Sequence, residues 1–497
     1  MLTRTLGFGS TLVLVHLLTP NDFGLVALAF SISQGVEMLS VFGIEDAVVR
    51  HHAPDRAIYD TAYTLNAVRA IGTAFMIAVS AWPMAAFFGE PRLTVVVLSL
   101  AISTLLAGFQ NIGAVDFRRN LTYGIEFQLR ILPRLVSVAA SLTIAFFFRT
   151  YWAIIVGTLV NRIATVLLTY RFHPYRPRLT LRAWRDLTGF SLWIWITGIV
   201  WLLRDRVGTF VIGRMLGIQS VGLFSMAMEV AVLPLSELMI PLTGVLFSTF
   251  SRASRDAQET VRLYLRFLGA SALVVIPAGI GVAVIADPLT RLMLGPQWLS
   301  AIPVIQVMAA CSPLAIISFI SRSLFEARGI MSSPFKVTLV SALLRILLCV
   351  ALAPSLGVLG VCIGAIATDL IDQVCLLTMT IRLLDISPLS VASQLWRPIV
   401  SAAAMAAGLL VAGLDSGWPG AGSATLLIEL VVAASLGSAL FFGADIILWL
   451  WVGSPYGAET DMLLAVRRTI CSVTESILRL FHIVRIPRLK AHERTPH

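Results

Sequence analysis

Long uncharged apolar runs recur along this chain from its first residues almost to its last, and short polar segments separate them. A helix needs roughly 20 mostly apolar residues to cross the hydrocarbon core of a bilayer. Suitable runs lie at approximately 3–18, 23–43, 63–83, 94–115, 130–148, 152–170, 190–213, 220–245, 263–286, 301–324, 336–353, 357–381, 398–414 and 424–452. The pattern predicts an all-α polytopic membrane protein with about 14 transmembrane helices.

Composition agrees with a membrane protein, because 58% of the residues are hydrophobic and only 13% are charged. The formal net charge is +10, but the basic residues lie mostly in the short segments between apolar runs. Such a distribution orients a membrane protein and differs from a nucleic-acid-binding surface. A cytoplasmic N-terminus places the strongly basic loops inside. We therefore expect an even number of crossings, both termini in the cytoplasm and no nucleic-acid partner.

The polar segments offer little room for catalysis. No loop predicted on the outer side exceeds roughly fifteen residues, and the longest inner loop, at about 170–190, is too short to form a domain. The sequence contains no GxxxxGK[ST] loop, no CxxC motif and no His/Cys cluster. We expect no direct use of ATP, no metal and no cofactor, and the protein is predicted not to be an enzyme.

Two parts of the chain repeat at a constant shift of 198 residues, which aligns Gly24 with Gly222 and Leu25 with Leu223. Many transporters consist of repeated halves with a substrate site between them. The repeat predicts two six-helix bundles related by a pseudo-two-fold axis, followed by two C-terminal helices. The expected units are a bundle at 1–189, a bundle at 190–385, two helices at 386–455 and a basic cytoplasmic tail at 456–497. Within the tail, apolar residues at steps of three and four predict an amphipathic helix on anionic lipid, with partner binding as the alternative.

Four motifs resemble those of polysaccharide flippases, including O-antigen repeat-unit flippases, in the multidrug/oligosaccharidyl-lipid/polysaccharide exporter superfamily. The first is the loop Leu17-Leu18-Thr19-Pro20-Asn21-Asp22-Phe23-Gly24. The others lie at 205–227, 246–252 and 356–361, and the resemblance extends from about residue 3 to 450. One departure is Ser248, where relatives often carry proline.

The resemblance implies a transporter of the bacterial inner membrane. Its substrate would be an undecaprenyl-diphosphate-linked oligosaccharide repeat unit, moved by alternating access between two bundles for export of lipopolysaccharide or exopolysaccharide. Membrane lipids and a polysaccharide polymerase with its chain-length machinery would be its partners.

Ionisable side chains within the predicted spans are candidates for a polar path. Each costs about 2.5 to 3.5 kcal/mol at the bilayer centre and normally faces protein or a water-filled cavity. The candidates are Arg162, Arg204, Asp205, Glu229, Arg345, Asp369 and Asp372. Successive helical residues point about 100° apart, so Arg204 and Asp205 cannot both face one cavity. We expect Arg204 to face it and Asp205 to tie the helix to a neighbour.

Arg204, Arg162 and Arg345 are the predicted substrate ligands, because a guanidinium can hold a diphosphate through paired hydrogen bonds. Asp205, Glu229, Asp369 and Asp372 are predicted to act in coupling or in structural ion pairs. Under an alternative interpretation, Arg162/Asp369 and Arg345/Asp372 are pairs that only hold the bundles together. Arg322, near a helix end, is expected to reach lipid headgroups.

Three other functions fit parts of the pattern. A flippase for peptidoglycan lipid precursors would bind the same diphosphate-polyprenyl group. A multidrug/cation antiporter of the same superfamily would favour a more acidic cavity. A membrane-embedded glycan polymerase would need an extended outer loop, which the predicted topology does not contain.

Overall fold

The computed structural model describes residues 2–40, 55–184, 192–417 and 422–453, together with residues 44, 48, 49 and 460. Every regular element in these ranges is a helix. The predicted all-α class is therefore confirmed for the described part of the chain. The predicted boundary at 189/190 and the amphipathic helix of the tail lie outside it.

The first group of helices precedes the connector at 173–184. It comprises α1 (Leu2–Leu17), α2 (Pro20–Met38), α4 (Arg56–Phe88), α5 (Arg92–Gly108), the 3₁₀ turn η1 (Ile112–Ala114), α6 (Val115–Arg119), α7 (Tyr123–Phe148) and α8 (Trp152–Phe172). The later elements are α10 (Leu192–Met215), α11 (Ile218–Ala253), α12 (Ala257–Val284), α13 (Ala286–Met293), η2 (Pro296–Ala301), α14 (Ile302–Cys311), η3 (Ser312–Leu314), α15 (Ala315–Ala327), α16 (Ser332–Leu384), α17 (Pro388–Val411) and α18 (Ser423–Trp451).

The continuous element α16 is in fact two helices joined at Gly357. This glycine has φ 61° and ψ −140°, a conformation that L-residues with a side chain rarely adopt. Beyond it the chain turns back on itself, since a Cβ on Gly360 would lie 2.3 Å from the Leu352 carbonyl oxygen. The predicted spans 336–353 and 357–381 are the two arms of this helical hairpin.

Nine described helical segments are long and apolar enough to cross a membrane, or ten if α5 and the η1–α6 segment, bent by 69°, form one span. Four predicted spans account for the difference between ten and 14. Helix α1 has only 16 residues, α2 has 19 and begins with Asn21 and Asp22 after a proline, and α10 carries three charged residues at 204–206. The two arms of the α16 hairpin are counted together as one segment. The protein is a multi-span membrane protein.

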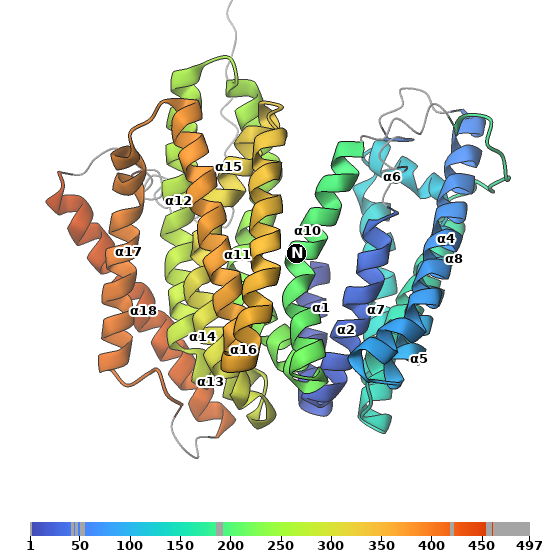
Figure 1. The fold of residues 1–497 in the computed structure, drawn as a ribbon, viewed down its shortest axis with the longest axis horizontal. Helices are drawn as coiled ribbons and strands as arrows, with labels where there is room; N and C mark the ends of the chain where they lie inside the picture. Colours follow the sequence, from blue (N-terminus) through green and yellow to red (C-terminus); the bar gives the residue numbers. More distant parts are fainter. Residues whose placement is uncertain are drawn as a thin grey trace, which may run out of the picture.

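Figure 1 shows two groups of helices that approach each other at the lower end of the view and diverge at the upper end. One group contains α1 to α8 with α10, and the other contains α11 to α18. The most extensive packing between the groups joins α2 to α11 and α10 to α16.

The connector after α8 is fastened to the first group. The backbone N–H of Arg178 donates to Asp60 Oδ1 at 2.9 Å, and that of Thr180 donates to Thr64 Oγ1 at 3.0 Å. The Tyr175 hydroxyl also donates to Asp60. Burial and this hydrogen bond raise the pKa of Tyr175, so it remains a donor at any physiological pH.

Candidate functional site: a cavity between two helix groups

A cavity of about 1160 Å³ lies between the two groups. Its walls come from α1, α2, α4, α6, α7, α8 and α10 on one side and from α11 and α16 on the other. The charged lining residues are Arg118, Glu126, Arg130, Arg134, Asp205, Arg206, Glu229, Glu237 and Arg345. Because η1, α6 and the start of α7 contribute to the lining, the cavity extends to the end where the groups diverge in Figure 1. We call this end the mouth.

The two walls differ in charge. Helices α6 and α7 contribute three arginines and one carboxylate, Glu126, whereas α11 contributes Glu229 and Glu237 among mainly apolar side chains. Carboxamides from α4, α8 and the α5–η1 turn add neutral donors and acceptors beside the arginines; they are Asn66, Gln110, Asn111 and Asn161. The basic wall can hold an anion, and the carboxamides can bind hydroxyl groups.

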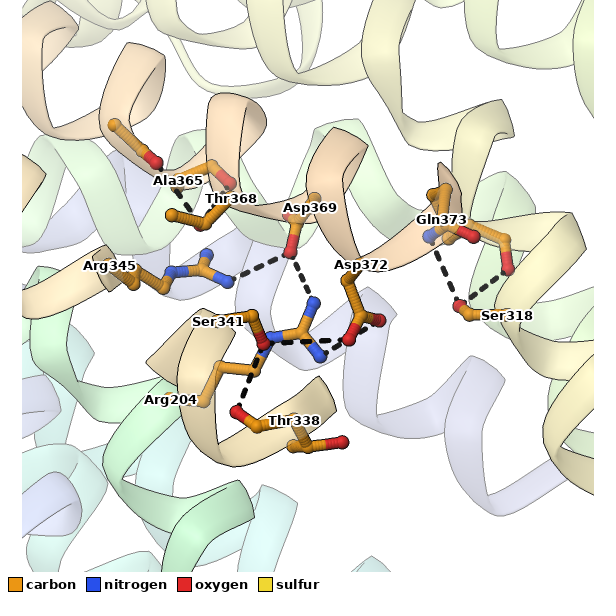
Figure 2. A network of polar contacts seen from close by, with 12 residues as sticks. Arg204, Ser318, Thr338, Ser341, Arg345, Ala365, Thr368, Asp369, Asp372 and Gln373 are labelled. Atoms are coloured by element: carbon orange, nitrogen blue, oxygen red, sulfur yellow. Dashed lines mark hydrogen bonds and ion pairs between the residues drawn. The ribbon is translucent and has the colours of Figure 1, made fainter. Parts of the chain in front are cut away.

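Next to the cavity, five charged side chains form what we call the ion network, drawn in part in Figure 2. Arg204 Nη2 donates to Asp369 Oδ1 at 2.6 Å, and Arg204 Nη1 donates to Asp372 Oδ2 at 3.3 Å. Arg345 Nη1 donates to the same Asp369 oxygen at 3.0 Å. Arg322 Nη2 donates to Asp372 at 2.8 Å, and its Nη1 donates to Thr338.

The ion network joins α10 to α15 and to both arms of the α16 hairpin. Asp372 has no exposed side-chain area and Arg204 has 6%. The guanidinium groups of Arg204 and Arg322 also lie over the Trp201 ring, 5.3 and 4.6 Å from its centroid. Removing one partner of a buried pair strands a charge at a cost of about 3–5 kcal/mol. The network therefore links α10, α15 and α16 through contacts that are costly to break one partner at a time, and we call this arrangement a brace.

The structure reverses the expected orientations of Arg204 and Asp205. Arg204 is buried in the ion network and does not line the cavity, whereas Asp205 does. The two side chains do point in different directions, as the helical geometry requires. The sequence could not determine which of them turns towards α16, because that depends on the rotation of α10 about its own axis.

The predicted ion pairs also have other partners. Asp369 contacts Arg204 and Arg345, and Asp372 contacts Arg204 and Arg322, so the pairs Arg162/Asp369 and Arg345/Asp372 are wrong. Arg322 belongs to the network and does not extend to headgroups.

The remaining candidates divide between the cavity and its surroundings. Arg345 and Glu229 line the cavity. Arg162 is half-buried on α8, and only its neighbours Asn161 and Thr165 contribute to the lining. Arg162 has no hydrogen bond or ion pair with any side chain that the structure describes.

Several cavity residues are absent from the sequence-based candidates. Arg118 lies between the predicted spans 94–115 and 130–148, and Arg130 and Arg134 lie at the start of the second of them. Arg206 and Glu237 had no predicted role. The cavity reaches helix ends as well as the bilayer centre, so depth within a span was too narrow a criterion. The density of arginines was the available signal, since four of them lie within the 17 residues 118–134. Among the described residues, no group of three or more His, Cys, Asp or Glu side chains is placed to hold a metal ion.

A helical membrane fold with a polar cavity between two groups of helices is typical of a transporter, and comparison with known proteins identifies the family. Residues 13–303, more than half of the chain, match the family described as polysaccharide biosynthesis protein, and the chain belongs to it.

Two relatives are informative. Lipopolysaccharide biosynthesis protein WzxC of Escherichia coli (strain K12) is 26% identical over 383 residues, which cover 74% of this chain and 76% of WzxC. Succinoglycan biosynthesis transport protein ExoT of Rhizobium meliloti (strain 1021) is 23% identical over 312 residues, covering 62% of this chain and 63% of ExoT. The chain thus spans less than two thirds of ExoT.

Two solved structures have the same fold. The lipid II flippase MurJ in an inward closed conformation aligns with a TM-score of 0.70 at 14% identity, over 91% of this chain and 98% of MurJ. An inward-facing multidrug resistance MATE family transporter of the MOP superfamily aligns with a TM-score of 0.63 at 14% identity. This alignment covers 77% of this chain and 95% of the transporter. The protein therefore has the fold of this superfamily.

Proposed function

We propose that this protein is a flippase that moves undecaprenyl-diphosphate-linked oligosaccharide repeat units across the bacterial inner membrane by alternating access. The observation that carries the proposal is the cavity between the two helix groups, lined by five arginines, in a chain of the polysaccharide biosynthesis protein family. The cavity of about 1160 Å³ exceeds the roughly 300–1,000 Å³ of common small-molecule sites. That size suits a diphosphate together with several sugars.

The proposed architecture has 14 spans in two six-helix bundles, at 1–189 and 190–385, with two further helices at 386–455 and a cytoplasmic tail at 456–497. Counting the α16 hairpin as two spans and η2–α15 as one gives this number. Both termini are proposed to be cytoplasmic, because the basic loops then lie inside. The mouth of the cavity, near the basic segment 115–119, would face the cytoplasm.

Within the cavity, Arg345 is the proposed ligand whose position is best defined. Its Nη1 is held by Asp369, while its buried Nε has no hydrogen-bond partner among the described residues. The ion network thus fixes the guanidinium and leaves donors for a second anion. Arg134 and Arg206 are proposed to complete the diphosphate site, and Arg204 to position Arg345 through Asp369.

Asp205 and Glu229 are proposed to take part in coupling, because both carboxylates face the cavity. Asp369 and Asp372 are instead structural members of the ion network. The proposed activity is transport without a covalent step. A polysaccharide polymerase and its chain-length machinery are proposed to act on the exported repeat units.

Two related activities share this fold. A cation antiporter is disfavoured because five arginines line the cavity, against four acidic residues, one of which, Glu126, is paired with Arg130 at 2.6 Å. A peptidoglycan-precursor flippase would bind the same diphosphate. Membership of the polysaccharide biosynthesis protein family favours the polysaccharide substrate.

The test is flipping of a fluorescent undecaprenyl-diphosphate oligosaccharide in proteoliposomes. We expect the wild-type protein to flip it and Arg345→Ala to lose at least about tenfold in rate, because a hydrogen bond to a charged group contributes about 1.5–3 kcal/mol. Arg262→Ala is the matched control. Arg262 Nη1 lies 3.7 Å from Glu259 Oε2, and both side chains are exposed on the surface. Equal loss in both variants, or no flipping by the wild type, would contradict the proposal.

A further inference from the structure

The N-terminal ends of α2 and α11 touch through two glycines. A Cβ on Gly24 would lie 1.9 Å from the Ile218 carbonyl oxygen, and a Cβ on Gly222 would lie 1.8 Å from the Pro20 carbonyl oxygen. Both distances are far too short for any side chain. Only glycine at both positions permits this close approach of the two backbones.

The contact is reciprocal under the internal repeat. The 198-residue shift that aligns Gly24 with Gly222 also aligns Pro20 with Ile218. Gly24 faces the carbonyl of Ile218, and Gly222 faces the carbonyl of Pro20, the residue equivalent to Ile218. This reciprocity is the pattern of a two-fold contact. The two segments that the repeat relates thus meet at equivalent positions.

A second contact between the halves lies at the same end. Gln297 Nε2, on η2, donates to the carbonyl oxygens of Val15 and Leu18 at 2.6 and 3.0 Å. The indole Nε1 of Trp298 donates to Val15 O at 3.3 Å, and its fully buried ring meets Phe23 edge-on at 5.5 Å.

The capping of α2 explains why these carbonyls accept from the other half. In a continuing helix, Val15 O and Leu18 O would receive the N–H groups of Thr19 and Asp22. Those two N–H groups instead donate to each other's side chains in a capping box, at 3.0 and 3.3 Å. The last carbonyls of α1 therefore lack helical donors, and Gln297 and Trp298 supply them.

These contacts close the end of the cavity opposite the mouth. The cavity lining begins at Ala27 on α2 and at Phe224 on α11, less than one turn beyond Gly24 and Gly222. Any substrate that leaves by this end must pass between the two glycines or past η2.

We propose that Gly24 and Gly222, together with the hydrogen bonds of Gln297 and Trp298 to α1, form a gate that separates when the cavity opens to the opposite side; this rests on the proposed transport function. We call it the distal gate. It contains no ion pair, so opening strands no charge. Gln297 is exposed, so water can replace its hydrogen bonds when they are released. The motif at 17–24 then has a physical role in closing this gate.

The first test uses alanine at the glycines, with Ser225→Cys as a reporter on the cavity lining. The five native cysteines are first replaced by alanine. A membrane-impermeant maleimide is added to oriented vesicles from the side opposite the mouth. We expect Gly24→Ala and Gly222→Ala to increase labelling of the reporter about tenfold, because overpacking destabilises the closed contact.

Each variant has a matched control on the same helix. Gly35→Ala on α2 meets only an ordinary contact at 3.8 Å, and Gly244→Ala on α11 meets nothing within 4 Å. Both controls should label like the parent protein. Unchanged labelling in the Gly24 and Gly222 variants would overturn the proposal.

The second test locks the gate and does not depend on the folding of the alanine variants. Gln297 Nε2 lies 2.6 Å from the carbonyl oxygen of Val15, next to His16, and both His16 and Gln297 are exposed. Thiols introduced by His16→Cys and Gln297→Cys can therefore be joined by a short bis-methanethiosulfonate cross-linker. Cross-linking should stop transport, and a reducing agent should restore it, whereas the reagent should not change the rate of either single variant. Undiminished transport by the fully cross-linked protein would overturn the gate.

The labelling test needs no substrate, which separates the two proposals. If labelling rises in the Gly24 and Gly222 variants but the protein flips no undecaprenyl-diphosphate oligosaccharide, the substrate assignment fails and the gate stands. If the lipid is flipped at the wild-type rate while the gate is locked, the gate fails and the proposed function stands.

Discussion

The ion network and the distal gate both join helices across the molecule, but they use opposite chemistry. The network connects α10 to α15 and α16 through buried charges, with Asp372 fully enclosed. The gate connects α2 to α11 and α1 to η2 through backbone contact and neutral hydrogen bonds. Breaking buried ion pairs costs several kcal/mol, whereas water compensates much of a lost neutral hydrogen bond. Backbone contacts and neutral hydrogen bonds are therefore better suited than buried ion pairs to contacts that must break in each transport cycle.

The ion network and the distal gate should therefore respond differently to mutation. Damage to the network should lower the amount of folded protein. Damage to the gate should leave the folded protein in place and change which side of the membrane the cavity faces.

The largest effect is expected for Asp372→Ala, which leaves the guanidinium groups of Arg204 and Arg322 without their shared carboxylate. We expect destabilisation by about 3–5 kcal/mol and loss of protein from the membrane. Thermal unfolding in detergent and quantitative immunoblotting measure this. Glu259→Ala, which breaks an exposed pair, is the control. Wild-type stability of the Asp372 variant would show that the network is not a brace.

An intermediate effect is expected for Gln297→Ala, which removes two hydrogen bonds to α1. The closed gate should lose about 1–2 kcal/mol, since each neutral hydrogen bond contributes roughly 0.5–1.5 kcal/mol. Labelling of Ser225→Cys from the side opposite the mouth should rise, while the protein level stays constant. Gln258→Ala, on an exposed side chain of α12, controls for the loss of a glutamine. A fall in protein level without increased labelling would show that Gln297 maintains the folded protein and does not control access to the cavity.

The smallest effect is expected for Arg162→Ala. This arginine lies outside the cavity lining and makes no ion pair with the described residues. Stability should change by no more than about 0.5 kcal/mol, and flipping should stay near the wild-type rate. Loss of flipping at unchanged stability would return Arg162 to the set of substrate ligands and extend the site along α8.

The helical membrane fold and the family could be predicted from the sequence, because hydrophobic run length and local motifs are properties of consecutive residues. The sequence also related Gly24 to Gly222 and selected Arg345 and Glu229, which line the cavity. Thr19 and Asp22 specify their capping box within four residues.

Which side chains contact one another depends on how the helices pack, and the sequence alone did not predict it. Arg204 and Asp205 are adjacent, and only the rotation of α10 against α16 places the first in the ion network and the second in the cavity. The repeat placed Arg162 opposite Asp369, but the partners of that carboxylate come from α10 and from the other arm of the α16 hairpin. A hydrophobic pattern specifies that a helix is buried in a membrane and leaves open how it is rotated and which helix it packs against. The contact between Gly24 and Gly222 likewise required two backbones to approach, a property of the assembled halves and of neither sequence segment alone.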